Sequence, residues 1–256
     1  MRIPGVDVRF AIIRIASTAA LFTAWEWYGS QPGQFALPPP SKVFPALVES
    51  IVDGGLVQAA IGTLWVGAVG FSIAAVLGVT LGLVIANVSW ADNTLTPLVN
   101  AAYAAPITML VPIIGIYTGL GFTGKVTLVV LFAFFVILIN TEAGVRQVRE
   151  DLVETARSFE ASRIQIARHV MLPSTMPFIL NGLRLGVGRA VRGAIVAELL
   201  LLVSNLGLFL IRAGATFNMP RLMAGIFFTM LMGYAVMWFA GYLERRSLRW
   251  RGEATY

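Results

Sequence analysis

Four charged side chains interrupt an apolar stretch that runs from about residue 177 to 203: Arg184, Arg189, Arg192 and Glu198. Charges at that depth in lipid are costly unless they face water, a partner or one another. On a helix, Arg184 and Glu198 fall within about 40° of one face, and Arg189 and Arg192 lie about 60° apart on another. Two interpretations follow: a path for a charged solute that uses Arg189, Arg192 and Glu198, or a buried ion-pair and packing network.

The segment from Gly119 to Val126, GLGFTGKV, is a second candidate for chemistry. It nearly matches the phosphate-binding pattern G-x-x-x-x-G-K-[ST], but Val126 stands where the pattern needs Ser or Thr, and no strand is predicted before it. We interpret it as a short turn between two membrane segments and not as a nucleotide-binding loop. The sequence has no cysteine and a single histidine, His169, which excludes thiol chemistry and histidine metal clusters.

Composition indicates the environment in which these charges lie. The 256 residues are 57% hydrophobic and only 12% charged. The charged fraction is about half that of an average soluble domain, and several apolar runs are long enough to cross a bilayer. We therefore predict an all-α integral membrane protein. The net charge of +6 is interpreted as a signal of topology and not of nucleic-acid binding.

The apolar runs predict about six membrane spans in a single domain over residues 1–256. They cover about residues 10–28, 59–86, 95–117, 126–139, 177–203 and 222–242. The first run is interpreted as a retained span and not as a cleaved signal peptide, because it is long and leads into interfacial aromatic residues. A surface amphipathic helix is expected near residues 43–52, so residues 1–58 precede a core bundle over 59–243, and 244–256 form a basic tail.

Basic residues orient this chain. With both termini in the cytoplasm, the outer segments hold only Lys42, Lys125, Arg212 and Arg221, whereas the inner segments hold most of the remaining arginines. This distribution follows the positive-inside rule. It places the polar segment between the fourth and fifth spans, residues 145–176, on the cytoplasmic side.

Proline and glycine predict how two spans behave. Pro97, Pro106 and Pro112 lie within the third span, where interior prolines break helices and are tolerated if protein or a water-filled cavity satisfies the freed backbone. That span is a candidate for a broken helix lining the pathway, at Pro106 and Pro112; a kink buried in packing is the alternative. Gly78 and Gly82 of the second span predict close helix packing.

The polar segment itself predicts a helix, a turn and a second short helix outside the bilayer. Apolar residues recur at helical spacing from Val145 to Phe159, and Ser162 with Gln165 has the form of a capping box. Pro173 is expected to end the second helix. On pattern alone, a solvated surface hairpin is an equal alternative.

The sequence of this segment resembles that of the cytoplasmic loop of permease subunits of binding-protein-dependent ABC importers. That loop reads E-A-A, three residues, Gly, nine residues, Ile, one residue, Leu-Pro. Here Glu154-Thr155-Ala156 stands at its first positions, Val170-Met171-Leu172-Pro173 at its last, and Glu160 at the Gly position. If that position requires a positive φ, Glu costs about 1 kcal/mol there.

Other segments of the chain resemble the nitrate, sulfonate and taurine branch of that family. Leu37-Pro38-Pro39-Pro40-Ser41, Gly182-Leu183-Arg184 and Glu244-Arg245-Arg246 with Trp250 match wording common in the branch. Arg192 departs from it, because an apolar residue is expected there. The branch takes varied solutes, so the sequence does not name this one.

The resemblance implies a type I ABC importer permease fold and a function. The chain would be a non-catalytic subunit of the bacterial inner membrane, surrounded by lipid and paired with a second copy of itself. Two ABC ATPase subunits, which bind the ATP and Mg, would dock on the loops. A periplasmic or lipoprotein solute-binding protein would deliver the solute, which we expect to be small and anionic. The ATPase-coupling residues would be Glu154, Thr155, Ala156, Glu160, Ala161, Ser162, Leu172 and Pro173. An ion-coupled transporter or channel that works without an ATPase is the alternative.

Overall fold

The computed structural model describes residues 8–53, 55–201 and 204–248, and regular structure within these ranges is entirely helical. The chain order is α1 (Val8–Gly29), α2 (Pro40–Val52), α3 (Gly55–Asn87), α4 (Ser89–Ala104), η1 (Ile107–Leu110), α5 (Val111–Thr118), α6 (Phe122–Arg146), α7 (Glu150–Ser158), α8 (Arg163–Ile166), η2 (Ala167–Met171), α9 (Leu172–Leu200), α10 (Asn205–Ala215) and α11 (Met219–Ser247). This arrangement confirms the predicted all-α class.

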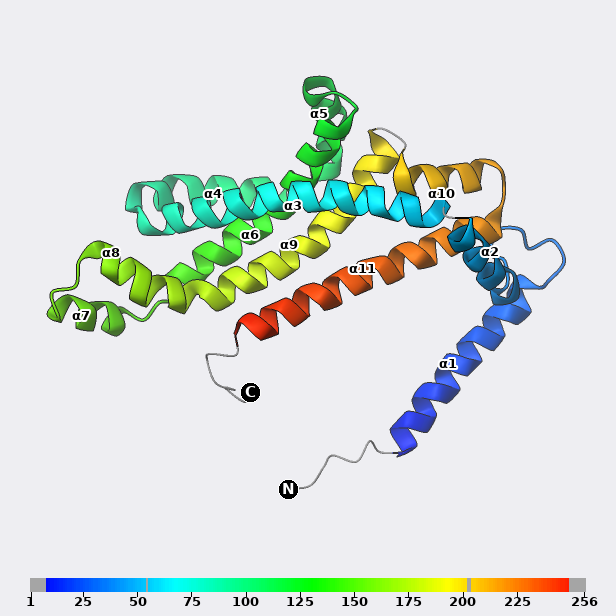
Figure 1. Cartoon of the computed structure of the whole chain (residues 1–256), viewed down its shortest axis with the longest axis horizontal. Helices are drawn as coiled ribbons and strands as arrows, with labels where there is room; N and C mark the ends of the chain where they lie inside the picture. Colours follow the sequence, from blue (N-terminus) through cyan, green and yellow to red (C-terminus); the bar gives the residue numbers. More distant parts are fainter. Residues whose placement is uncertain (1–7, 54, 202–203, 249–256) are drawn as a thin grey trace.

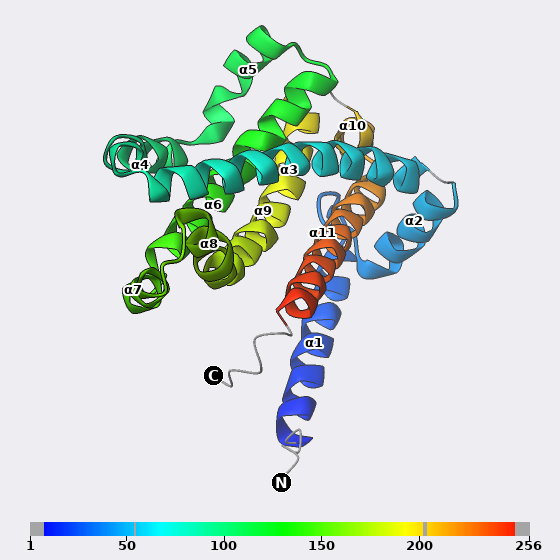
Figure 2. The ribbon, with the colours of Figure 1, turned by 60° about the vertical axis from the view of Figure 1, so that its left-hand side comes forward.

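Helices α3, α6 and α9 pack side by side and form the core of the molecule (Figures 1 and 2). Their contact surface is made of small and branched side chains, among them Val129, Ala133, Ile137 and Ala194, which are fully buried or nearly so. A Cβ added at Gly78 of α3 would lie 2.9 Å from Ile137 of α6. Glycine thus lets α3 and α6 approach closely, as predicted, within one chain.

The predicted third span is broken. Helix α4 and the η1–α5 segment meet at 86°, and the break falls at Ala105 and Pro106. Pro106 has no N–H to continue the ladder of α4, whereas Pro112 stands in the first turn of α5, where that loss is harmless. Both prolines are exposed on this chain, so the bend is not buried in the chain's own packing.

Three described helices are long and apolar enough to cross a membrane: α3, α6 and α11. Counting each bent pair as one span, α4 with η1–α5 and the run from Arg163 to Leu200 with α10, gives up to five. The predicted first span folds as α1, which lies outside this count. It stands apart from the core (Figure 1) and is tied to it by Trp25, which stacks on Phe227 of α11 at 5.4 Å.

Several predicted spans were shorter than the helices that the structure shows. Helix α6 starts at Phe122 and runs to Arg146, and α9 starts at Leu172, so Pro177 lies inside a helix that it was expected to begin. The stripe from Val145 to Phe159 is not one helix, because α6 ends and α7 begins between them. Helix α11 continues to Ser247, and the remainder of the basic tail, with Arg249 and Trp250, lies outside the described residues.

Candidate functional site

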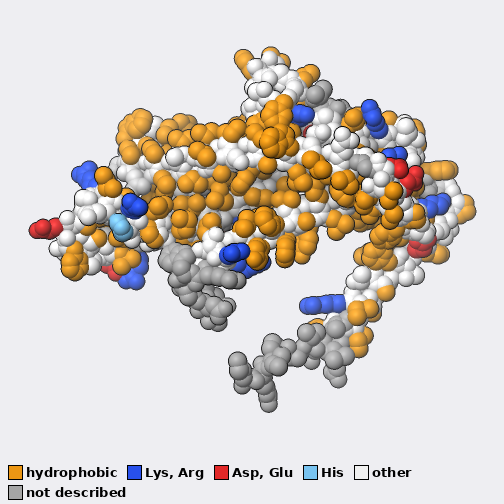
Figure 3. Space-filling model, viewed as in Figure 1, with side chains coloured by type: hydrophobic (Ala, Val, Ile, Leu, Met, Phe, Trp, Pro, Cys, Tyr) orange, Lys and Arg blue, Asp and Glu red, His pale blue; other side chains and the backbone are white. Residues whose placement is uncertain are grey.

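The hairpin formed by α7 and α8 projects from one end of the bundle. Figure 3 shows charged side chains gathered at this end, whereas apolar side chains cover the body of the molecule. At the start of α7 the Arg149 guanidinium donates hydrogen bonds to the Asp151 carboxylate, and these lower the pKa of Asp151 below its usual value. Phe159 at the tip is 82% exposed.

The turn after α7 has the backbone geometry that favours glycine, although Glu160 occupies it. Glu160 has a φ of 56°. Its N–H donates to the carbonyl of Arg157 at 2.9 Å, and the Ala161 N–H donates to that of Ala156 at 3.1 Å. These two bonds form a Schellman motif, which closes the helix with a left-handed residue. The turn therefore keeps the geometry, at a cost of about 1 kcal/mol for a side chain there.

The capping box that starts the second helix is confirmed. The Ser162 N–H donates to the Gln165 side chain at 2.7 Å, and the Gln165 N–H donates to the Ser162 hydroxyl at 3.3 Å. The expectation that Pro173 ends this helix is wrong. A π turn, Ala167–Met171, precedes Pro173, and the helical backbone continues from Arg163 through α9. Pro173 stands in the first turn of α9, where its missing N–H is tolerated.

A notch of about 400 Å³ lies between α7 and the start of α9. Thr155, Ala156 and Pro173, three of the predicted coupling residues, line it together with Leu152 and His169. The other predicted coupling residues lie around it: Glu154, Glu160, Ser162 and Leu172 are exposed and Ala161 is half-buried. The hairpin thus presents a hollow together with exposed polar side chains and the exposed apolar side chains of Phe159 and Leu172.

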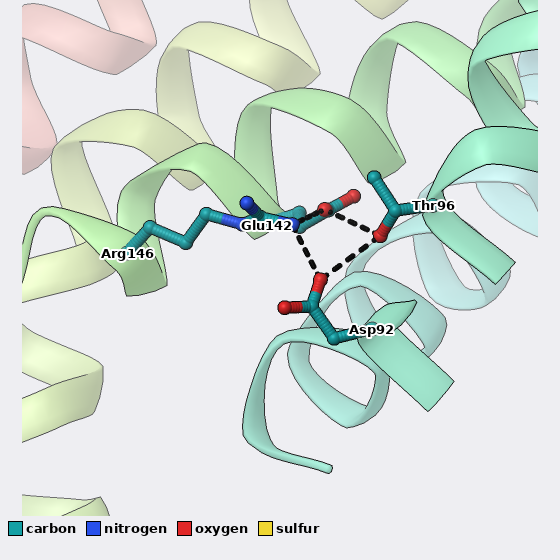
Figure 4. A network of polar contacts seen from close by, with 4 residues as sticks. All are labelled: Asp92, Thr96, Glu142 and Arg146. Carbon is teal, nitrogen blue, oxygen red and sulfur yellow. Dashed lines mark hydrogen bonds and ion pairs between the residues drawn. The ribbon is translucent and has the colours of Figure 1, made fainter. Parts of the chain in front are cut away.

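Just before the hairpin, four polar side chains join α4 to the end of α6 (Figure 4). Arg146 forms ion pairs with Asp92 and Glu142. The Thr96 hydroxyl lies 3.0 Å from the Asp92 carboxylate and 2.8 Å from that of Glu142, so its one hydrogen can serve either. We call these four residues the α4–α6 clasp. Sequence analysis missed it, because its members lie far apart in the chain.

Of the predicted pathway residues, Arg189 contacts the end of α4 beside the bend. Arg189 of α9 donates a hydrogen bond of 3.0 Å to the hydroxyl of Tyr103, which lies at the end of α4, just before Pro106. Arg192, one turn further along α9, is exposed. Tyr103 was not among the predicted residues, although a tyrosine three residues before an interior proline of an apolar span is a signal that could have found it.

Arg184 and Glu198 have other partners. Arg184 pairs with Glu244 of α11 at 3.0 Å. Glu198 is completely buried, and its carboxylate accepts hydrogen bonds from the Thr63 hydroxyl at 2.7 Å and the Asn205 side chain at 2.6 Å. The packing-network interpretation describes Glu198 in this structure, because the carboxylate links α3, α9 and α10.

The glycine-rich segment before α6 serves as a turn. Lys125 is buried, and its amino group donates a hydrogen bond of 2.9 Å to the Ser204 hydroxyl. A phosphate-binding lysine needs a free amino group at the end of a strand-to-helix loop. Within the described residues, no group of three or more His, Asp or Glu side chains is arranged to hold a metal ion.

Comparisons with known proteins identify the relatives of this chain. Residues 78–249, which include the hairpin, the clasp, Arg189 and Arg192, match the family described as "Binding-protein-dependent transport system inner membrane component". The riboflavin transport system permease protein of Chloroflexus aurantiacus is 32% identical over 84% of this chain and 81% of its own length. A putative aliphatic sulfonates transport permease protein of Bacillus subtilis is 31% identical over 84% and 78%.

A solved structure has the same fold. A chain of the inward-facing MetNI methionine ABC transporter superposes with a TM-score of 0.66 at 18% identity, over 76% of this chain and 97% of that one. The family match covers well over half of the sequence. The chain therefore belongs to this family: it is the non-catalytic inner-membrane permease subunit of a binding-protein-dependent ABC importer.

Proposed function

We propose that two copies of this permease form the pathway through which a small anionic solute is imported. The observation that carries the proposal is the pair of arginines on α9, with Arg189 held by Tyr103 at the break of α4 and Arg192 exposed beside it. Neither arginine forms an ion pair among the described residues. Unpaired positive charge in a membrane segment is costly, and an anion crossing there would offset that cost.

The arrangement of the helices supports six spans with both termini in the cytoplasm of a bacterium. Helices α3, α4–α5, α6, α9 and α11 alternate in direction, and α1 supplies the sixth span. The hairpin, the connection between α3 and α4 and the end of α11 lie toward one end of the bundle in Figure 1. That end is the cytoplasmic one under the positive-inside rule.

The hairpin is the dock for the ATPase in this proposal, one subunit on each copy of the permease. The notch lined by Thr155, Ala156 and Pro173 receives a side chain of the ATPase. The exposed Glu154 and Phe159 contact the ATPase surface around that side chain. ATP and Mg are bound by the ATPase and not by this chain. A solute-binding protein, periplasmic or lipid-anchored, delivers solute to the opposite end.

Mechanically, the clasp connects the dock to the pathway. A force on α7 reaches the end of α6, where Arg146 pairs with Asp92 of α4 and Glu142 accepts a hydrogen bond from Thr96 of α4. Helix α4 in turn carries Tyr103, so its displacement moves the partner of Arg189. ATP can drive this change only by being bound more tightly in one state of the complex than in the other.

A second copy has a surface on which to pack. The bend of α4 and the segment after it expose large apolar side chains, and Met109, Ile116 and Tyr117 are at least 75% exposed. One chain supplies one half of a pathway, so the exposed prolines Pro106 and Pro112 lie on the face that we assign to the pathway and to the second copy. Pro106, Pro112, Arg189 and Arg192 line it, and Glu198 supports it from the packed side by fixing α10.

The test is uptake by proteoliposomes that hold the permease, its ATPase and the binding protein, with radiolabelled ethanesulfonate as the probe. Arg189→Gln and Arg192→Gln should each lower ATP-dependent uptake about tenfold, the effect of losing one well-placed charged contact. Dimer mass by light scattering should stay unchanged, and Arg14→Gln on the outlying α1 serves as the control. Undiminished uptake in both variants would remove the proposal.

Two other functions make different predictions. An ion-coupled transporter or channel would move solute in liposomes that lack the ATPase. A pathway for an uncharged vitamin is favoured by the riboflavin relative, whose sequence is 32% identical. Riboflavin uptake that survives Arg189→Gln and Arg192→Gln, with no uptake of ethanesulfonate by the unmodified complex, would favour that function.

A further inference from the structure

The end of the molecule opposite the hairpin contains a pocket of about 550 Å³ that is lined by both polar and apolar residues. Its walls come from the first turn of α3, from α10 and from the start of α11. Its volume falls within the usual range of small-molecule sites, about 300–1,000 Å³. On the proposed topology this pocket opens on the extracytoplasmic side, where solute arrives.

Two arginines from different helices line this pocket: Arg212 of α10 and Arg221 of α11. The Arg221 guanidinium lies 5.3 Å from the centroid of the Phe209 ring, which leaves its planar edge free for hydrogen bonding. None of the ion pairs among the described residues includes either arginine. Among the described residues, the pocket lining includes no Asp or Glu, and amide or hydroxyl side chains supply its other polar groups: Gln58, Asn205, Thr216 and Asn218.

The backbone between the two arginines is held in place by a strained turn. Helix α10 closes with a Schellman motif in which Phe217 takes a φ of 53° and the Asn218 N–H donates to the Ala213 carbonyl at 2.9 Å. The Asn218 side chain then accepts a hydrogen bond of 3.1 Å from the Arg221 N–H and so starts α11. A non-glycine residue at positive φ persists where its surroundings require it.

A second strained residue lies on the other side of the pocket. Asn205 has a φ of 49°, and its side chain donates to the buried Glu198. An alanine at Gly62 would put its Cβ 2.3 Å from the Asn205 side chain. The Asn205 side chain therefore occupies the space that the missing side chain of Gly62 leaves on α3. Of the non-glycine residues with positive φ in the described chain, Asn205 thus lines this pocket, and Phe217 lies between Thr216 and Asn218, which line it.

The placement of positive charge points to an anion. Extracytoplasmic segments of membrane proteins are poor in Lys and Arg, and this chain has few there. One of them, Lys125, is engaged by Ser204, yet Arg212 and Arg221 converge on one cavity from separate helices. Guanidinium groups match the planar geometry of oxyanions and bind them through paired hydrogen bonds.

We infer that this pocket binds the oxyanion head group of the solute before the solute reaches Arg189. The inference rests on the proposed function, in which the solute is an anion. The pocket is a separate site: Arg189 lies about 16 Å along α9 from the end of that helix beside α10, at 1.5 Å per residue. Arg212 and Arg221 hold the charged group, and the amides and the hydroxyl accommodate the rest of a small molecule.

The test uses the permease alone, in nanodiscs of phosphatidylcholine, with ethanesulfonate as the probe. Phenylglyoxal modifies free guanidinium groups, and mass spectrometry reports each arginine separately. Ethanesulfonate should protect Arg212 and Arg221 in the unmodified protein, while the exposed Arg163 of α8 stays reactive. By calorimetry, the double variant Arg212→Gln, Arg221→Gln should bind the probe at least about tenfold more weakly. Arg212→Lys with Arg221→Lys should retain part of the affinity, and Arg245→Gln should change nothing.

Four results would overturn the inference. Equal protection by a neutral probe of the same size, such as methylurea, would remove selectivity for charge. Protection that requires phosphatidylglycerol in the nanodisc would identify a lipid head group as the anion. Unchanged probe binding in the double variant, together with weaker capture of the binding protein, would identify a docking surface. If the complete importer takes up ethanesulfonate but no protection is seen, this site fails while the proposed function stands.

Discussion

The guanidinium of Arg189 lies 5.6 Å from the ring centroid of Tyr103 and also donates a 3.0 Å hydrogen bond to the hydroxyl of that tyrosine. Two helices that are separated by 86 residues of sequence at this point are thus joined beside a break in one of them. The contact fixes a positive charge at the bend. Its removal should therefore affect transport more than folding.

Tyr103→Phe should lower ATP-dependent uptake about three- to tenfold, because it removes one hydrogen bond to a charged group and keeps the ring. Tyr103→Ala, which removes both contacts, should lower uptake further. Uptake by reconstituted complexes is the measurement, and Tyr234→Phe, on a side chain of α11 that is 71% exposed, is the matched control. Equal uptake by the Phe and unmodified proteins would show that the hydroxyl contact has no part in transport.

Glu154→Arg should uncouple the complex, because it reverses a charge on the exposed face of the hairpin. ATP hydrolysis should continue at the basal rate of the free ATPase, without the stimulation that solute-loaded binding protein normally gives. The ratio of solute imported to ATP hydrolysed is the measurement. Glu49→Arg on α2, at the opposite end of the molecule, should leave that ratio unchanged. A normal ratio in Glu154→Arg would argue against the hairpin as the dock.

Glu160→Gly should stabilise the hairpin by up to about 1 kcal/mol, because glycine adopts a φ of 56° without steric cost. Hydrogen exchange of the amides of Glu160 and Ala161 should slow by up to about fivefold, following that free energy. Ser158→Gly, in the last turn of α7, is the contrasting variant and should speed exchange. Faster exchange in Glu160→Gly would mean that the glutamate side chain stabilises the turn.

Arg146→Gln should loosen the α4–α6 clasp, since it leaves the buried Glu142 without its cation. The expected loss of stability is about 1–3 kcal/mol, because Arg146 itself is half exposed. Thermal unfolding of the purified permease measures that loss, and the transport assay measures coupling. The double variant Arg146→Gln, Glu142→Gln should recover stability but not coupling. If the two substitutions were simply additive, the clasp would not act as one unit.

Features that depend on neighbouring residues were predictable from the sequence. The capping box of Ser162 and Gln165 and the break at Pro106 follow from short-range hydrogen bonding, and both are confirmed. The effect of Pro173 was not predictable. A π turn precedes it, so the helix continues although Pro173 has no N–H to donate. Whether Glu160 keeps the glycine geometry also required the coordinates.

Contacts between distant segments were beyond sequence reasoning. Helical geometry places Arg184 and Glu198 on one face, but it cannot choose Glu244 as the partner of Arg184 or Thr63 as a partner of Glu198. Those choices depend on how α3, α9, α10 and α11 pack. The same holds for Arg146, whose partner Asp92 lies on another helix.

The glycine contacts along α3 limit how the importer can change shape. At Gly70, Gly78 and Gly82 the backbone of α3 lies directly against side chains of α6, with no space for even a methyl group. Surfaces fitted that closely cannot slide past each other without strain. Helices α3, α6 and α9 should therefore turn as one stiff lever, and the compliant joint of each subunit is left at Ala105 and Pro106.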